Sequence, residues 1–363
     1  MINTVFVIGA GASHEIDMPL GSVLKKQIAQ LFKRDSAEIS ISAHQNPKKN
    51  VYQSLELYQT GTIQRTSQRL IVGDNTPEWV KNLILAESID NFINNHRDKE
   101  DLVVTCKVGI IQAILQTEEK SKLFDNRPKS NFYKLPMYFK DIEDTYYVAL
   151  WKKLIEGCLY HELVERLKQI TFIVFNYDRS LEYFLYNAIK EYYEIDDKES
   201  AKAVNGINII HPYGQVGFLD CLHEDGIHYG SLSTPEKICG LVHEIKTFTE
   251  TVNPDNETYK KMYKSISAAE RLIFLGFAYH AQNLQLLFPE GLYDENSQFR
   301  KNKYPTRRSA LEIYGTCFGL SDVDQQYVKG KLNGITENVA IRGFFDGECR
   351  KFFSEYNLAL SFL

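Results

Sequence analysis

Polar residues with catalytic potential follow two short apolar runs, about one strand-helix-strand unit apart in the chain. Asn176 and Asp178 come directly after the run at residues 171–175, and His211 follows the run at residues 207–210. An asparagine amide donates and accepts hydrogen bonds at once, and a histidine takes up a proton near neutral pH. Taken singly, each has a structural explanation: Asp178 could cap a helix, and a lone histidine is more often structural than catalytic. Together they predict one crevice that both side chains face.

A glycine-rich turn near the start of the chain has the composition of a phosphate-binding loop. After the apolar run at residues 4–8 the turn reads Gly9, Ala10, Gly11, Ala12 and Ser13. A helical pattern at residues 20–32 follows, and backbone N–H groups at such a turn can approach a pyrophosphate. His14 stands where dehydrogenases have a third glycine, and no clear acidic residue closes the next strand. The turn predicts nucleotide binding but argues against hydride transfer; the alternative is a tight turn without a ligand.

The elements that must position these residues alternate between strands and helices. Strand-like runs lie at residues 4–8, 171–175, 207–210, 271–275, 310–314 and 339–341. Helical patterns follow most of them, for example at residues 181–190 and 284–287. Such alternation predicts an α/β fold with an open parallel, Rossmann-like sheet of about six strands. Ligands of these sheets bind beyond the carboxyl ends of the strands, which is where Asn176 and His211 fall.

Residues 36–168 contain few strand patterns and are predicted to form a large, mostly helical insertion module. Residues 1–35 and 169–363 then form the predicted Rossmann-like domain. Within the insertion, helical patterns lie at residues 76–93, 107–119 and 144–168. Thr76 is the expected N-cap of the first of them, with Pro77 in its first turn.

The composition excludes several classes of protein. The 363 residues include 44% hydrophobic and 25% charged residues, which is typical of a globular chain and not of a disordered one. The 42 basic and 47 acidic residues give a net charge of −5, which argues against direct nucleic-acid binding. We find no secretory signal pattern and no apolar run near the ~18 residues that span a bilayer, so we expect a cytoplasmic protein. The aromatic content of 12% is high, with 22 Tyr and 21 Phe.

Two smaller groups of residues favour ordinary explanations. A loose group between residues 221 and 243 consists of Cys221, His223, His228, Cys239 and His243. Its spacing matches no paired-ligand pattern, so we predict no metal site, and the six cysteines form no C-x-x-C pair and are expected to be free thiols. A basic run consists of Arg300, Lys301, Lys303, Arg307 and Arg308. It is expected to be a solvated loop, with docking of an acidic partner or of a nucleic-acid backbone as the alternative.

Four motifs, taken in order, resemble the sirtuin-like NAD-consuming domain of bacterial antiphage defence proteins. These motifs are residues 9–13, 175–178, 211–214 and 274–277. Residues 88–92 (Ser-Ile-Asp-Asn-Phe) also resemble a motif of that family, and the resemblance extends from residue 4 to about residue 345. It implies that Asn176 positions the nicotinamide ribose or the attacking water, that Asp178 lies near the nicotinamide carboxamide, and that His211 acts as base toward ribose hydroxyls.

The resemblance also implies the remaining contacts to NAD. The pyrophosphate and the neighbouring ribose would lie against Gly9, Ala10, Gly11 and Ser13. The adenosine half would lie against Gly276, Phe277, Gly315 and Thr316. Protein deacylases of the sirtuin superfamily carry a four-cysteine zinc ribbon, which is missing here, and residues 17–21 replace the usual Phe-Arg segment.

The expected function is therefore NAD glycohydrolysis without a metal, yielding nicotinamide and linear or cyclic ADP-ribose. The family role would be that of an NAD-depleting effector in abortive infection. Two alternatives stay open: a non-catalytic NAD or ADP-ribose binding subunit of a defence complex, and a zinc-free deacylase. Because NAD depletion is lethal, we expect regulation by homo-oligomerisation or by a separate subunit such as a HerA-type ATPase. The aromatic surplus would then serve partly in subunit contacts of the insertion.

Overall fold

The computed structural model describes residues 2–33, 46–61, 76–125, 137–231, 234–252, 256–288, 310–336 and 338–362. Six strands form one all-parallel sheet in the order β3-β2-β1-β4-β5-β6. The strands are β1 (Thr4–Ile8), β2 (Ile170–Val174), β3 (Asn208–Ile210), β4 (Arg271–Leu275), β5 (Leu311–Thr316) and β6 (Val339–Phe345). The predicted α/β class with an open, Rossmann-like parallel sheet is confirmed. Every residue of β1 and β4 is buried, as expected for central strands covered by helices on both faces.

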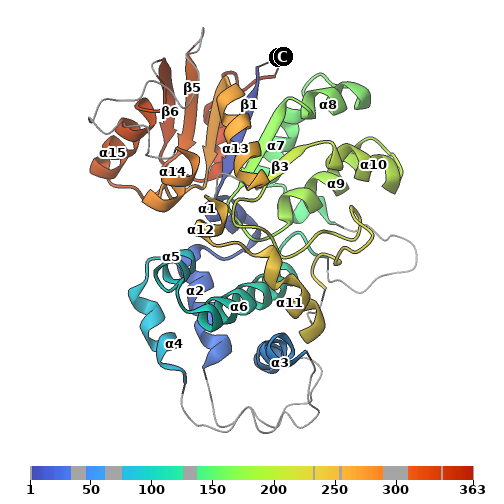
Figure 1. Ribbon diagram of the computed structural model, residues 1–363. Helices are drawn as coiled ribbons and strands as arrows, with labels where there is room; N and C mark the ends of the chain where they lie inside the picture. The colour runs from blue at the N-terminus through green and yellow to red at the C-terminus, as the bar shows by residue number, and fades with distance from the viewer. Residues whose placement is uncertain are drawn as a thin grey trace.

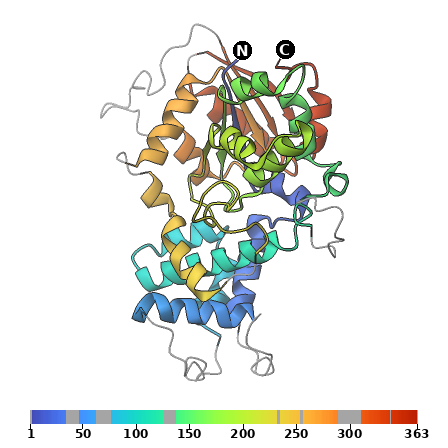
Figure 2. The same ribbon diagram turned by 90° about the vertical axis from the view of Figure 1, so that its right-hand side faces the viewer.

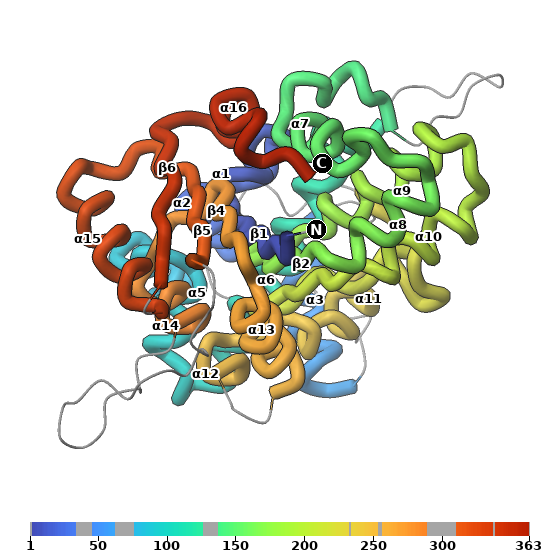
Figure 3. The backbone as a smooth tube through the Cα atoms, turned by 90° about the horizontal axis from the view of Figure 1, so that it is seen from above, coloured from blue at the N-terminus to red at the C-terminus, as the bar shows by residue number. Residues whose placement is uncertain are grey.

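Helices cover both faces of the sheet. They are α7 (Tyr146–Leu154), α8 (Tyr160–Leu167), α9 (Ser180–Tyr192), α10 (Asp197–Asn205), α13 (Glu257–Ala268), α14 (Ala281–Leu287), α15 (Asp322–Asn333) and α16 (Cys349–Glu355). Seen from above, α7 and α16 lie together on one side of the strands, while α13 and α14 lie on the other (Figure 3). None of the helices in the described part of the chain is long and apolar enough to cross a membrane.

A second group of helices lies beyond the carboxyl ends of the strands, and we call it the helical body (Figure 1). It contains α2 (Gly21–Phe32), α3 (Pro47–Thr60), α4 (Glu78–Asn82), α5 (Ile89–Asn95), α6 (Glu100–Glu118) and α11 (Pro235–Leu241). Helix α6 is its centre and packs against α2, α3, α5 and α11. Helices α7 and α8, which also fall within residues 36–168, pack against α9 and β2 instead. The predicted domain boundaries at residues 36 and 168 stay a prediction.

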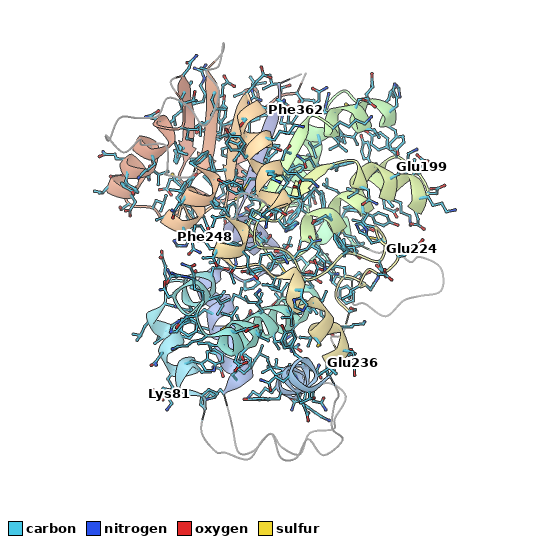
Figure 4. The ribbon with its side chains drawn as sticks, viewed as in Figure 1. Lys81, Glu199, Glu224, Glu236, Phe248 and Phe362 are labelled. Atoms are coloured by element: carbon cyan, nitrogen blue, oxygen red, sulfur yellow. The ribbon has the colours of Figure 1, made fainter. Side chains whose placement is uncertain are left out.

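The remaining elements are short. They are α1 (Ala10–Ser13), η1 (His14–Ile16), η3 (Leu83–Leu85), η4 (Phe139–Ile142), η5 (Val242–Glu244) and α12 (Phe248–Thr251). Both chain ends lie on the side of the sheet away from the helical body (Figure 2). Two labelled side chains in Figure 4 show the two opposite sides of the sheet: Phe362 lies near the chain ends, and Phe248 lies between the sheet and the helical body.

Two predicted helices are interrupted. The helix expected over residues 76–93 is wrong as one element, because α4 begins after Pro77 and α5 begins again after Ser88. Ser88 has extended backbone angles and its Oγ accepts a hydrogen bond from Asn91 N over 3.0 Å, so it caps a new helix, whereas Thr76 is not an N-cap. The pattern at residues 144–168 is divided between α7 and α8 by a turn at Gly157, whose φ of 67° is left-handed.

Candidate functional site

The segments that follow β1, β2 and β3 meet at the carboxyl edge of the sheet. Because β2 pairs in parallel with both β1 and β3, the three strands end side by side. The Asn176 amide nitrogen Nδ2 donates to the Gly9 carbonyl oxygen over 3.3 Å and to Ser13 Oγ over 2.8 Å. His211 Nδ1 lies 3.1 Å from the Asn176 carbonyl oxygen. These four residues, Gly9, Ser13, Asn176 and His211, are named the Asn176 cluster.

The Asn176 side chain is held in one orientation and keeps one polar atom without a partner. The Gly9 carbonyl oxygen can only accept a hydrogen bond, so the amide nitrogen must be the atom that faces it. The other amide atom, Asn176 Oδ1, is buried and has no hydrogen-bond partner among the described residues. A buried acceptor without a partner lowers the stability of the fold by roughly 1–3 kcal/mol. In native proteins such an atom is usually satisfied by a ligand or a water. Asn176 Oδ1 is therefore an acceptor that a hydroxyl group or a water can use.

His211 is bound at both ring nitrogens. Its Nε2 lies 2.7 Å from Glu182 Oε1, and the two side chains are only 8% and 10% exposed. Because Nδ1 faces a carbonyl oxygen, Nδ1 carries a hydrogen, and a proton must also lie between Nε2 and the Glu182 carboxylate. Burial alone would lower the pKa of His211, but the charge and hydrogen bond of Glu182 outweigh it, and the pKa is raised above its ordinary 6.5.

Sequence reasoning missed Glu182. This residue lies in the first turn of α9 and is buried, as are the residues that follow it up to Ile189. The one available signal was an acidic residue within the mainly apolar stretch of residues 181–189. An acidic residue in a first helical turn is also commonplace, because it interacts favourably with the helix dipole, so the signal was weak.

Asp178 is buried directly before the first turn of α9. Its Oδ1 accepts a hydrogen bond from Ser180 N over 3.1 Å, next to Arg179, which is the N-cap residue of α9. Burial raises the pKa of Asp178 from 3.8 to about 6, and the carboxylates of Glu118 and Glu182 act in the same direction, while hydrogen bonds from Ser180 act against it. The contact with a nicotinamide carboxamide stays a prediction.

A buried chain of hydroxyl groups extends from the Asn176 cluster. Ser13 Oγ lies 3.3 Å from Tyr147 Oη, and Ser180 Oγ lies 2.9 Å from Tyr229 Oη, which in turn lies 3.1 Å from Ser121 Oγ. Tyr147 and Tyr229 are fully buried. Part of the high tyrosine content therefore lies inside the molecule as hydrogen-bonded core, while the predicted role of the other aromatics in subunit contacts stays a prediction.

One buried ion pair joins the site to the helical body. Glu118, at the end of α6, accepts a hydrogen bond from Arg179 Nε over 3.1 Å, and both side chains are almost completely buried. The Arg179 guanidinium also donates to the carbonyl oxygens of Phe218 and Ile227 over 3.1 and 2.7 Å. Arg179 directly follows Asp178, so helix α6 fixes the segment after β2 through this pair.

A second contact with the helical body involves the residue between Asn176 and Asp178. The Tyr177 hydroxyl donates to Asp90, which lies within the motif at residues 88–92 on α5. Burial raises the pKa of Asp90, although the Tyr177 hydrogen bond acts against it. The motif therefore has two visible structural uses: Ser88 caps α5, and Asp90 holds Tyr177.

The glycines after β1 have a packing role. Gly9 N donates to the Leu275 carbonyl oxygen and Gly11 N to the Gly276 carbonyl oxygen, each over 2.9 Å. A Cβ added at Gly9 or Gly11 would lie 2.6 or 2.8 Å from the Gly276 oxygen, which real Cβ atoms do not do. These glycines are thus required where the segments after β1 and β4 meet, and the pyrophosphate contact of Gly9, Ala10 and Gly11 stays a prediction.

The helix expected over residues 20–32 is present as α2, and two short helical turns that were not expected precede it. One turn of helix, α1, is followed by η1 and by Asp17 in the left-handed region with a φ of 67°, and α2 begins only at Gly21. Ser13 belongs to α1, and Ala10, which begins it, is partly exposed.

The residues predicted for the adenosine half lie around the ends of β4 and β5. Gly276, with a φ of 57°, has a backbone N–H that donates to Thr316 Oγ1 over 2.8 Å. Phe277 is buried, with its ring 5.1 Å from that of Phe175. A Cβ at Gly315 would lie 2.5 Å from the Tyr279 hydroxyl. The structure brings these residues together with each other, next to the Asn176 cluster, mainly through backbone and aromatic packing.

The other sequence groups do not join this site. Among the described residues, no three His, Cys, Asp or Glu side chains are placed to hold a metal ion. All six cysteines are free. The basic run from Arg300 to Arg308 lies outside the described residues. Two surface hollows of 540 and 430 Å³ lie elsewhere, the first between α7 and α9 beside Trp151 and Phe184, the second between α7 and α16 beside Arg350.

Comparison with known proteins adds no relative: no protein-family model matches this chain, and no curated protein matches it.

Proposed function

We propose that this chain hydrolyses NAD to nicotinamide and ADP-ribose at the Asn176 cluster. The observation that carries the proposal is Asn176 itself, whose amide is anchored by Gly9 and Ser13 and whose Oδ1 is buried without a partner. The cluster lies at the carboxyl edge of an open parallel sheet, where such folds bind nucleotides. The resemblance of the motifs to sirtuin-like NAD-consuming enzymes supports the same reading.

Cleavage of the bond between nicotinamide and ribose requires mainly that the protein position the substrate and stabilise the developing charge. When the bond between nicotinamide and ribose breaks, positive charge develops on the ribose and nicotinamide leaves as a neutral molecule. The enzyme must orient the ribose, exclude bulk water and admit one attacking water. Asn176 Oδ1 suits the acceptor role toward that water or toward a ribose hydroxyl, and His211 suits the role of base. Asp178, buried with a raised pKa, keeps its segment in place beside them.

The test is direct measurement of turnover. The purified chain is incubated with NAD, alone and together with the product of the neighbouring gene, and nicotinamide is followed by chromatography. Release that disappears in Asn176→Ala and in His211→Ala supports the proposal. The exposed residues Asn333 on α15 and His161 on α8 provide matched controls, since alanine there leaves the cluster untouched.

A non-catalytic NAD or ADP-ribose binding subunit is the second candidate. The observation that favours it is the engagement of both ring nitrogens of His211, which leaves the imidazole without an unused acceptor. Tight binding of NAD without nicotinamide release under every condition would establish this candidate. Release that depends on an added acyl-lysine peptide would instead establish a zinc-free deacylase.

The proposed cellular role follows from the chemistry and the resemblance. An enzyme that depletes NAD harms its own cell, so we propose that it acts as an effector of antiphage defence and stays silent until triggered. Self-assembly or a separate subunit, such as a HerA-type ATPase, would supply the trigger. Turnover that appears only with the partner, or only in an assembled fraction from a sizing column, would distinguish these two forms of control.

A further inference from the structure

Glu182 is the charged side chain that contacts His211 directly. Its Oε1 lies 2.7 Å from His211 Nε2, within the range of a charge-assisted hydrogen bond. Both side chains are about nine-tenths buried, so water does not compete strongly for either of them. The second carboxylate oxygen, Glu182 Oε2, is buried and has no hydrogen-bond partner among the described residues.

The surroundings of His211 fix where its protons lie. On the side of β2, the Asn176 carbonyl oxygen accepts from Nδ1. On the side of α9, the carboxylates of Glu182 and, further away, Asp178 both favour the charged imidazolium. Arg179, next to Asp178 in the chain, is paired with Glu118, so these two opposite charges largely offset each other's effect on His211. Without a proton between Nε2 and Oε1, the lone pair of His211 Nε2 would face the negatively charged Glu182 carboxylate away from water, which is unfavourable.

We propose that Glu182 is the positioning residue for His211, holding the imidazole in one orientation and sharing a proton with its Nε2. The two groups titrate together, because the protonation state of each one changes the pKa of the other. For turnover, and here the inference rests on the proposed function, this shared proton first leaves to solvent. The deprotonated pair then takes up the proton of a ribose hydroxyl: the O–H bond breaks, the proton is again shared between His211 Nε2 and Glu182 Oε1, and the electron pair stays on the ribose oxygen.

The pair can be tested without NAD, by NMR titration of the full chain with ¹³C-labelled histidine. The nine histidines give separate Cε1–H resonances, and the one missing in His211→Gln belongs to His211. In the wild-type chain we expect its titration midpoint above 6.5, and in Glu182→Gln we expect the midpoint to fall by about one to three pH units. Glu191→Gln, the same substitution further along α9, is the matched control and should leave the midpoint unchanged.

Each outcome decides the proposal. A wild-type midpoint below 6.5 overturns it even if Glu182→Gln fails to fold. An equal midpoint in the wild type and in a folded Glu182→Gln also overturns it. If the wild type releases nicotinamide, the acid limb of its kcat/KM profile should move to lower pH in Glu182→Gln by the shift seen in the NMR titration. If the wild type shows the NMR shift but never cleaves NAD, the shared proton is supported and only the proposed function is refuted.

Discussion

The carboxyl edge of the sheet has two halves with different chemistry. In the polar half, after β1, β2 and β3, side chains donate and accept the hydrogen bonds, and Asn176 Oδ1 and Glu182 Oε2 have unused capacity. In the packed half, after β4 and β5, Gly276 pairs through its backbone and Phe277 lies among aromatic rings. A position at the end of a strand brings a residue to this edge in both halves. The polar half differs in that Asn176, His211 and Glu182 contact one another in turn and include two groups that can take up or release a proton.

The largest expected effect tests whether chemistry is confined to the polar half. If the proposed function holds, His211→Ala should lower nicotinamide release by about 10²- to 10⁴-fold, the usual contribution of a general base, and Asn176→Ala should lower it comparably. Thr316→Val, in the packed half, should change kcat/KM by less than about tenfold, because it removes one hydrogen bond to the Gly276 backbone. Chromatographic assay of nicotinamide checks all three. A Thr316→Val variant as inactive as His211→Ala, yet folded, would place the packed half in the site.

The second effect concerns the buried charge that only the polar half contains in the described structure. Glu118→Gln should destabilise the fold by about 3–5 kcal/mol, because it leaves the Arg179 guanidinium buried without its partner. Urea unfolding measures this, with Glu165→Gln in the exposed pair with Lys168 as the control, expected within about 0.5 kcal/mol of the wild type. The double variant Glu118→Leu with Arg179→Met should lose less than Glu118→Gln alone. A loss near that of Glu165→Gln would mean that the ion pair does not hold the segment after β2.

The third effect concerns the packed half. Gly276→Ala should cost at least about 2 kcal/mol, because φ at this position is 57° and the new Cβ would overlap the backbone of Ala12. Gly240→Ala is the matched control: its Cβ would meet nothing within 4 Å on α11, so alanine should stabilise the fold by about 0.5–1 kcal/mol. Chemical unfolding of both variants gives the comparison. A tolerated Gly276→Ala would contradict the close approach of the segments after β1 and β4.

The polar half also shows how far the sequence could predict the site. The central strands were predictable because β1 and β4 lie in nearly continuous apolar runs, whereas β6 extends past Arg342 and Gly343 to Phe345, beyond the run at residues 339–341. The meeting of Asn176 with His211 followed from two neighbouring parallel strands ending at one edge. Glu182 and Tyr147 were not predictable, because tertiary packing decides which way a helical side chain faces. Likewise, nothing local pairs Glu118 with Arg179, which belong to separate helical and sheet segments. The interruption at Ser88 was readable as a capping residue before an apolar stretch, but the surrounding helical periodicity obscured it.

The last expected effect is a pH dependence of stability that arises from Asp178 in the polar half. The pKa of Asp178 is about 6 in the folded chain against an ordinary 3.8, so between these values the folded state binds more protons than the unfolded state. Stability must therefore fall as the pH rises through this window, by at most about 1.4 kcal/mol per pH unit for one proton. Asp178→Asn keeps the acceptor for Ser180 N but has no carboxyl to ionise, so it should gain stability relative to the wild type as the pH rises.

Free energies of unfolding measured in urea between about pH 4 and pH 7 check this difference, and subtraction of the two curves removes the titration of other buried acids such as Glu15 and Asp90. Thr316→Val, in the packed half, should give a curve parallel to that of the wild type, because it changes no ionisable group. If the Asp178→Asn curve is parallel as well, Asp178 ionises normally, and the burial of its charge does not separate the polar half from the packed half.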